Sequence, residues 1–206
     1  MIKSIKLLSL FVILFSLILT SCASTKLTGS WKDEQYTGTV KKVLIIGMSK
    51  KPTVKRLFEM EFDRQFKARG IDAVSGFRVL PPEFKPDKAV LLSTVKELNV
   101  NAVLITRVMD KKTVDRHYPR GVYVSYPGYY NDMHDFYGRS YQYVAAPSYS
   151  YEQDVVYLET NVYDAVTEKM IWAALSKTFP RGAVKKEIST FVEIMMKKMA
   201  ADKILE

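Results

Sequence analysis

The sequence predicts one α/β domain with a mixed sheet of about five strands. In the first half, short continuous apolar runs, typical of strands buried on both faces, alternate with amphipathic helical segments. The second half adds a period-two apolar pattern, a short turn, another apolar run and a closing helix. The expected order is β-α-β-α-β, a long Tyr-rich loop, an antiparallel hairpin and a C-terminal helix, all within residues 40–206.

The first half contains three predicted strands and two predicted helices. Val43–Gly47 is a continuous apolar run within the first strand. Pro52 favours the first turn of a helix, and Gly70 stands where a helix end needs a left-handed residue. Asp87 is placed to cap the second helix. The predicted ranges are strands 40–48, 71–80 and 101–108 and helices 52–69 and 87–98.

The second half predicts a hairpin and a helix. Residues 154–164 alternate with one apolar face, and 167–169 form a turn into the apolar run 170–175. A helix over 183–204 carries apolar residues on one side. Its four lysines, which we interpret as a solvated helix face rather than a binding patch, are Lys185, Lys186, Lys197 and Lys198.

The N-terminus predicts an export signal over residues 1–21. Lys3 and Lys6 precede an apolar run over 7–19, which is shorter than the roughly 20 residues of a membrane-spanning helix. The run ends in Leu-Thr-Ser before Cys22, the chain's single cysteine. This segment resembles the lipobox of bacterial lipoproteins, which implies that Cys22 is acylated and begins the mature chain. The alternative is an ordinary signal peptide that happens to end near a cysteine.

The lipobox resemblance implies a location. Acyl chains on Cys22 would anchor the protein durably to a membrane, and Ala23 in the following position implies the outer membrane, facing the periplasm. Residues 22–39 are polar and small and predict a lipid-anchored tether. Loss of Lys3 and Lys6 leaves 29 basic against 22 acidic side chains, an excess that favours anionic neighbours. An exported lipoprotein is not expected to meet nucleic acid.

A Tyr/Gly/Pro-rich insert over 115–152 is the unusual feature. Residues 118–151 hold ten of the thirteen tyrosines, and the segment exceeds the length of ordinary connections. Tyrosine is favoured where surfaces recognise partners, so the insert predicts contacts with an envelope protein or with peptidoglycan. The alternative is a connection whose tyrosines cover the adjacent sheet. The candidate contact residues are Tyr123, Tyr126, Tyr129, Tyr130, Tyr137 and Tyr141.

Candidate catalytic and metal sites are weak. His117 and His134 are the only histidines, and Asp132 and Asp135 beside His134 are interpreted as polar loop residues rather than metal ligands. No hydrolase (G-x-S-x-G) or zinc-protease (H-E-x-x-H) motif is present, and Cys22 is assigned to lipid. We therefore expect no catalytic residues, no metal and no cofactor, while an enzyme of unrecognised type stays open.

Two other positions are singled out. Gly47 and Ser49 follow a buried strand and precede a helix, where open α/β sheets bind ligands. They define a candidate pocket for a small ligand or nucleotide. Glu61 falls between Leu57 and Phe58 on the apolar stripe of the first helix. A buried carboxylate needs partners, so a structural pairing is expected there in preference to catalysis.

The element order and several short motifs resemble a group of small envelope lipoproteins. Their domain is similar to the N-terminal domain of TolB and to the periplasmic domain of the curli secretion channel lipoprotein. The motifs are Trp31–Asp33, Val43–Gly47, Phe58–Glu59, Arg69–Ile71, Asn101–Ile105 and Leu158–Ala165 running to Ile171–Trp172. The resemblance implies a non-enzymatic accessory or scaffold in the envelope, and it implies no catalytic residues.

Overall fold

The structure is a computed structural model that describes residues 24–81, 87–113, 132–135 and 154–205. One mixed sheet of six strands runs in the order β1-β6-β5-β4-β2-β3. The strands are β1 (Thr25–Lys32), β2 (Lys42–Met48), β3 (Asp72–Ser75), β4 (Ala102–Thr113), β5 (Asp154–Asp164) and β6 (Met170–Thr178). The helices are α2 (Pro52–Lys67), α3 (Gly76–Val79), α4 (Lys88–Leu98) and α6 (Val184–Ala201). The predicted mixed α/β fold is confirmed.

Parallel and antiparallel pairing divide the sheet. β2 pairs in parallel with β3 and β4, whereas β4, β5, β6 and β1 form an antiparallel meander. The parallel part follows from its helical crossovers, and within the antiparallel part β5 and β6 are joined by a short turn. Consequently β2, β4 and β6 end, and β1 begins, at the same end of the sheet along the strand direction. We call it the Ser24 end. The opposite end, which holds the β5–β6 turn, is the Glu168 end.

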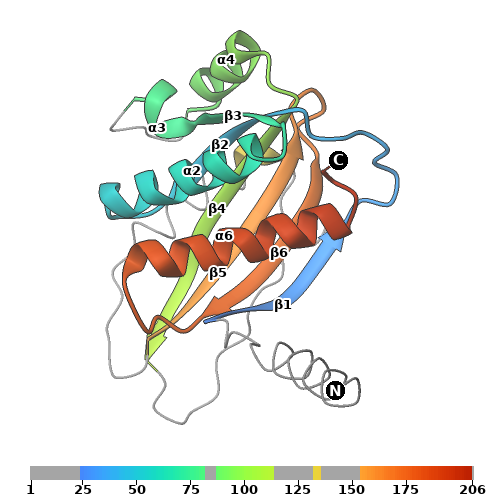
Figure 1. Cartoon of the computed structure of the whole chain (residues 1–206). Helices are drawn as coiled ribbons and strands as arrows, with labels where there is room; N and C mark the ends of the chain where they lie inside the picture. Colours follow the sequence, from blue (N-terminus) through green and yellow to red (C-terminus); the bar gives the residue numbers. More distant parts are fainter. Residues whose placement is uncertain (1–23, 82–86, 114–131, 136–153, 206) are drawn as a thin grey trace, which may run out of the picture.

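Helices cover both faces of the sheet. α2 and α6 lie side by side over one face, as Figure 1 shows, and pack through Phe62, Phe66 and Phe191 into the larger core cluster. α3 and α4 lie over β2 and β4 on the other face, where Leu91 and Val95 contact a second cluster. This arrangement explains why β2 is buried along nearly its whole length.

Local capping confirms the predicted helix boundaries. Pro52 occupies the first turn of α2, and Gly70 after its end has a φ of 76°. The Asp87 carboxylate accepts hydrogen bonds from the backbone N–H groups of Ala89 and Val90 at the start of α4. These caps satisfy donors and acceptors that a helix end leaves unpaired. For that reason they could be predicted from residue type and spacing.

The prediction that residues 22–39 form a tether is wrong for residues 25–32. Thr25–Lys32 is β1, an edge strand that pairs antiparallel with β6, so the sheet has six strands rather than about five. The strand was missed because an edge strand buries little, and half of its residues are exposed. Only Ala23 and Ser24 separate the predicted acylation site, Cys22, from the folded sheet.

The predicted strand over 71–80 is also too long. β3 ends at Ser75, and Gly76–Val79 forms the short helix α3. The Phe77 N–H donates to the Glu59 carboxylate at 2.6 Å instead of to a neighbouring strand, so the ladder stops there. An ideal Cβ at Gly76 would lie 2.9 Å from the Ile45 carbonyl oxygen, which favours glycine at this close approach.

Among the described residues, none of the helices combines the length and the apolar composition that crossing a bilayer requires.

Candidate functional site

Gly47 and Ser49 lie at the Ser24 end of β2, where the chain turns into α2. The crossovers from β2 and β3 leave on opposite faces, so this is the switch point at which open sheets bind ligands. A hollow lined by Gly47, Ser49 and Phe58 encloses only about 10 Å³, close to the space of one water molecule. This volume gives no support for a nucleotide, and the ligand pocket stays a prediction.

The Glu59 carboxylate lies buried next to Gly47, beneath the candidate pocket. Its side chain on α2 is fully buried, and its two oxygens accept the backbone N–H groups of Gly47 at 2.9 Å and Phe77 at 2.6 Å. Burial raises the pKa of Glu59, while these two donors and Lys55 act in the lowering direction. The carboxylate thus joins α2 to the ends of β2 and β3, and both of its oxygens are occupied.

A second buried carboxylate lies on the sheet. Glu159 of β5 is fully buried, and its Oε2 accepts from Arg107 Nε at 2.7 Å and Nη2 at 2.6 Å. Burial raises the pKa of Glu159, against the lowering effect of the charge and hydrogen bonds of Arg107. Glu159 and Arg107 are both removed from water, so loss of either would leave the other as a buried charge without a partner, which is strongly destabilising.

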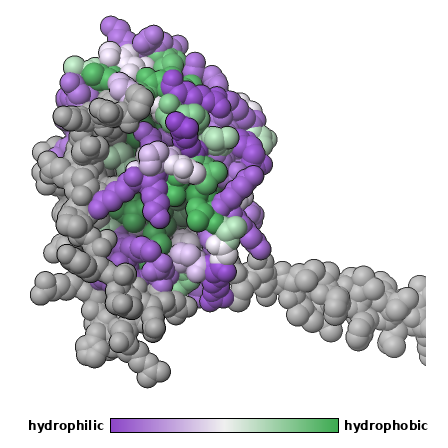
Figure 2. Space-filling model, turned by 90° about the vertical axis from the view of Figure 1, so that its left-hand side faces the viewer, coloured by the Kyte–Doolittle hydropathy of each residue, from purple (hydrophilic) through white to green (hydrophobic). Residues whose placement is uncertain are grey.

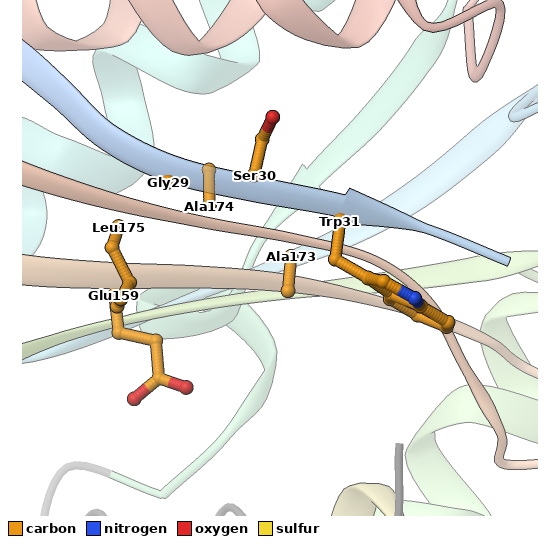
Figure 3. A pocket seen from close by; sticks show the side chains of 7 residues that line it. All are labelled: Gly29, Ser30, Trp31, Glu159, Ala173, Ala174 and Leu175. Atoms are coloured by element: carbon orange, nitrogen blue, oxygen red, sulfur yellow. The ribbon is translucent and has the colours of Figure 1, made fainter. Parts of the chain in front are cut away.

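Asn161 and Tyr163 extend this network along one face of β5. Asn161 Nδ2 lies 3.3 Å from both Glu159 Oε1 and Tyr163 Oη. Glu159 and Trp31 lie on one side of the sheet and Ser30 on the other, as Figure 3 shows. A hollow beside Glu159 encloses about 10 Å³. The arrangement holds strands β4 and β5 together and offers no space for a substrate next to the carboxylate.

Glu61 has the structural pairing that the sequence predicts. Its side chain accepts from Arg64 on α2 and, at 3.0 Å, from the Ser189 hydroxyl on α6. Hydrogen bonding to Arg64, followed by bonds to Gln65 and Ser189, lowers the pKa of Glu61 to about 2. Glu61 therefore links the two long helices at the edge of their interface.

The remaining predicted site residues fall into two groups. His134 is described, and within the described residues no cluster of at least three His, Cys, Asp or Glu side chains is placed to hold a metal ion. The Asp132 carboxylate instead accepts the Asp135 N–H at 2.8 Å. The predicted residues outside the described part of the chain are Cys22, His117, Tyr123, Tyr126, Tyr129, Tyr130, Tyr137 and Tyr141.

Glu59, Arg107 and Glu159 are buried polar groups that are not among the predicted site residues. Spacing could have identified Glu59, which stands three residues before Phe62 and seven before Phe66 on one helix face. Glu159 lies on the more polar face of an alternating strand, and such a face is usually solvated. Both sides of β5 are buried at this point, and this follows only from packing.

The chain matches no protein-family model and no curated protein sequence. Among solved structures, it is similar to a PelC dodecamer from Paraburkholderia phytofirmans, with a TM-score of 0.48, 12% identity, and coverage of 88% of this chain and 99% of that chain. Lipoprotein GNA1162 from Neisseria meningitidis gives a TM-score of 0.39 at 11% identity, with coverage of 78% and 98%. Similarities at this level establish neither a shared function nor the predicted resemblance to TolB.

Proposed function

We propose that this chain is an acylated envelope lipoprotein whose α/β domain faces the periplasm and acts by contact rather than by catalysis. The observation that carries the proposal is Cys22, which directly follows an apolar run preceded by Lys3 and Lys6. Acyl chains on this thiol hold a protein at a bilayer. Ala23 favours the outer membrane in the sorting pattern that the segment resembles.

The chemistry of the buried carboxylates supports an accessory role. The oxygens of Glu59 are bonded to two backbone N–H groups, and those of Glu159 are bonded to Arg107 and Asn161. A catalytic acid or base must reach the proton that it transfers. In the described part of the chain, these two groups are committed to holding elements together. The partner of the domain is an envelope protein or peptidoglycan, contacted through the Tyr-rich insert.

Metabolic labelling with a palmitate analogue tests the anchor. We expect the wild-type chain to incorporate the label and to fractionate with outer membranes. Cys22→Ser should lose both properties, because the acceptor thiol is gone. Ser21→Ala is the matched control, since it changes the adjacent small residue and keeps the thiol. Equal labelling and fractionation of Cys22→Ser and the wild type would overturn the proposal.

Deletion of residues 115–150 tests the partner. We expect the deleted chain to remain acylated and to lose the envelope protein or peptidoglycan that co-purifies with the full chain. An unchanged set of co-purifying partners would show that the Tyr-rich insert does not provide the contact.

A further inference from the structure

The connection between Cys22 and the sheet is very short. Ser24 is already fixed, because its carbonyl oxygen accepts the Phe179 N–H at 2.8 Å and its hydroxyl donates to the Glu187 carboxylate. Thr25 follows with a 2.7 Å contact between its hydroxyl and that of Thr178. Two residues of extended chain span at most about 7 Å. An acylated Cys22 therefore keeps the Ser24 end close to the headgroups of its bilayer.

The Ser24 end carries an excess of positive charge beside this attachment point. Five basic side chains, here called the basic corner, come from β1, β6, the connection between β6 and α6, and the start of α6. One acidic side chain lies among them: Glu187, which accepts from the Ser24 hydroxyl and the Arg181 N–H. Within the described residues, none of the five forms an ion pair. The basic corner consists of Lys26, Lys177, Arg181, Lys185 and Lys186.

Several other basic side chains of the described residues do form ion pairs. At the neighbouring ends of β4 and β5, Lys111 pairs with Asp154 at 2.7 Å. Further along α6, Lys197 pairs with Glu193 and Lys198 pairs with Asp202, each at 2.7 Å. The basic corner thus concentrates unneutralised charge next to the anchor. Lys185 and Lys186 are exposed, as predicted for a solvated helix face, and so are free to meet a charged surface.

Apolar side chains accompany the charge. The Lys177 ammonium lies 5.8 Å from the centre of the Phe179 ring, and Val184, the first residue of α6, is 54% exposed. The face in Figure 2, seen from the left of Figure 1, shows hydrophilic side chains around an apolar area. Basic residues beside exposed apolar ones suit the interface of an anionic bilayer.

We propose that the basic corner docks on the anionic headgroups of the leaflet that holds the acyl chains and so sets one orientation of the domain. This inference rests on the proposed acylation of Cys22. The tether of about 7 Å is shorter than the screening length of about 8 Å at physiological ionic strength, so these charges act on the leaflet. Docking points the Glu168 end away from the bilayer, toward the periplasm.

Single-site fluorescence quenching tests the orientation. Because Cys22 is acylated and is the single cysteine, Val184→Cys and Val166→Cys each provide one free thiol for a dye. Val166 is the matched control, since it is 86% exposed and lies in the turn at the Glu168 end. The acylated full chain is reconstituted into vesicles of phosphatidylcholine with 30% phosphatidylglycerol and headgroup-quencher lipids. We expect strong quenching at position 184 and little at 166.

Charge reversal tests the cause. Lys185→Glu/Lys186→Glu should reduce the quenching at position 184 by about tenfold or more, because each basic side chain changes binding to an anionic surface by about fivefold. Lys96→Glu/Lys169→Glu carries the same charge change away from the corner and should leave quenching intact. Equal quenching at 184 and 166, in protein shown to float with the vesicles, would overturn the orientation and leave the anchor standing.

Two further outcomes are informative. Loss of flotation together with loss of palmitate label would refute the proposed function, and this inference with it. Unchanged quenching, with loss of peptidoglycan binding in Lys185→Glu/Lys186→Glu, would show that the corner serves a polymer and would also overturn the lipid proposal.

Discussion

Among the described residues, two carboxylates are fully buried, Glu59 and Glu159, and they are held in different ways. Backbone N–H groups of Gly47 and Phe77 bind Glu59, whereas side chains of Arg107 and Asn161 bind Glu159. Backbone donors are present whatever the side chains are, so the Glu59 position depends on the path of the chain. The Glu159 position depends on residue identity at 107 and 161. Each carboxylate joins elements that are distant in sequence. Substitutions at residues 107 and 161 should disturb Glu159, whereas only a change in the backbone path or in Glu59 itself should disturb the Glu59 bonds.

Removing one member of the ion pair should have the largest effect. Arg107→Met leaves Glu159 charged in a buried site without its cation, which should cost about 3–5 kcal/mol of unfolding free energy. Arg107→Met/Glu159→Met should recover most of that loss, because two apolar side chains can fill the same space without a charge. Urea unfolding measures both values.

The exposed pair Lys111 and Asp154 provides the control. Its side chains are about half exposed, so Lys111→Met should cost less than about 1 kcal/mol. A loss in Arg107→Met no greater than that in Lys111→Met would mean that the buried pair contributes nothing beyond a surface pair.

The Glu59 position should show an intermediate effect. Glu59→Gln keeps one carbonyl oxygen for two N–H donors and places its amide nitrogen against the other, which should cost about 1–3 kcal/mol. Glu97→Gln, an exposed position on α4, is the isosteric control and should change stability little. If the two variants unfold at the same urea concentration, the backbone bonds to Glu59 are dispensable.

The pH dependence of stability should give the smallest and most specific difference. The pKa of Glu61 in the folded protein is lowered to about 2. Its contribution to the free energy of unfolding is therefore complete above about pH 4.5 and is lost as the pH falls toward 2. The folded pKa of Glu59 is raised. The contribution of Glu59 to the free energy of unfolding is present below about pH 4.5 and is lost as the pH rises through its pKa in the folded protein.

Two variants separate these contributions. Glu61→Gln should lower the unfolding free energy by about 1 kcal/mol at pH 6, and the difference from the wild type should disappear near pH 2. Glu59→Gln should remove the opposite trend above pH 4.5. Unfolding followed by circular dichroism from pH 2 to pH 7 measures both. A constant difference between Glu61→Gln and the wild type across this range would contradict the assigned pKa.

Prediction succeeded where the local pattern decides the structure. The apolar run Val43–Gly47, the Asp87 cap and the glycine at position 70 each depend on residues a few positions apart. Prediction failed for β1, because an edge strand needs only a partner and little burial. It failed for residues 76–80 because Glu59, distant in sequence, captures the Phe77 N–H.

The sequence by itself determined the order and type of most elements, the predicted acylation site at Cys22 and the total charge. Those properties depend on composition and short-range periodicity. Tertiary structure decided that the carboxylates of Glu59 and Glu159 are buried and that five basic side chains gather beside Ser24. These outcomes depend on which strands become neighbours, and residues as far apart as Ser24 and Glu187 meet only when β1 pairs with β6.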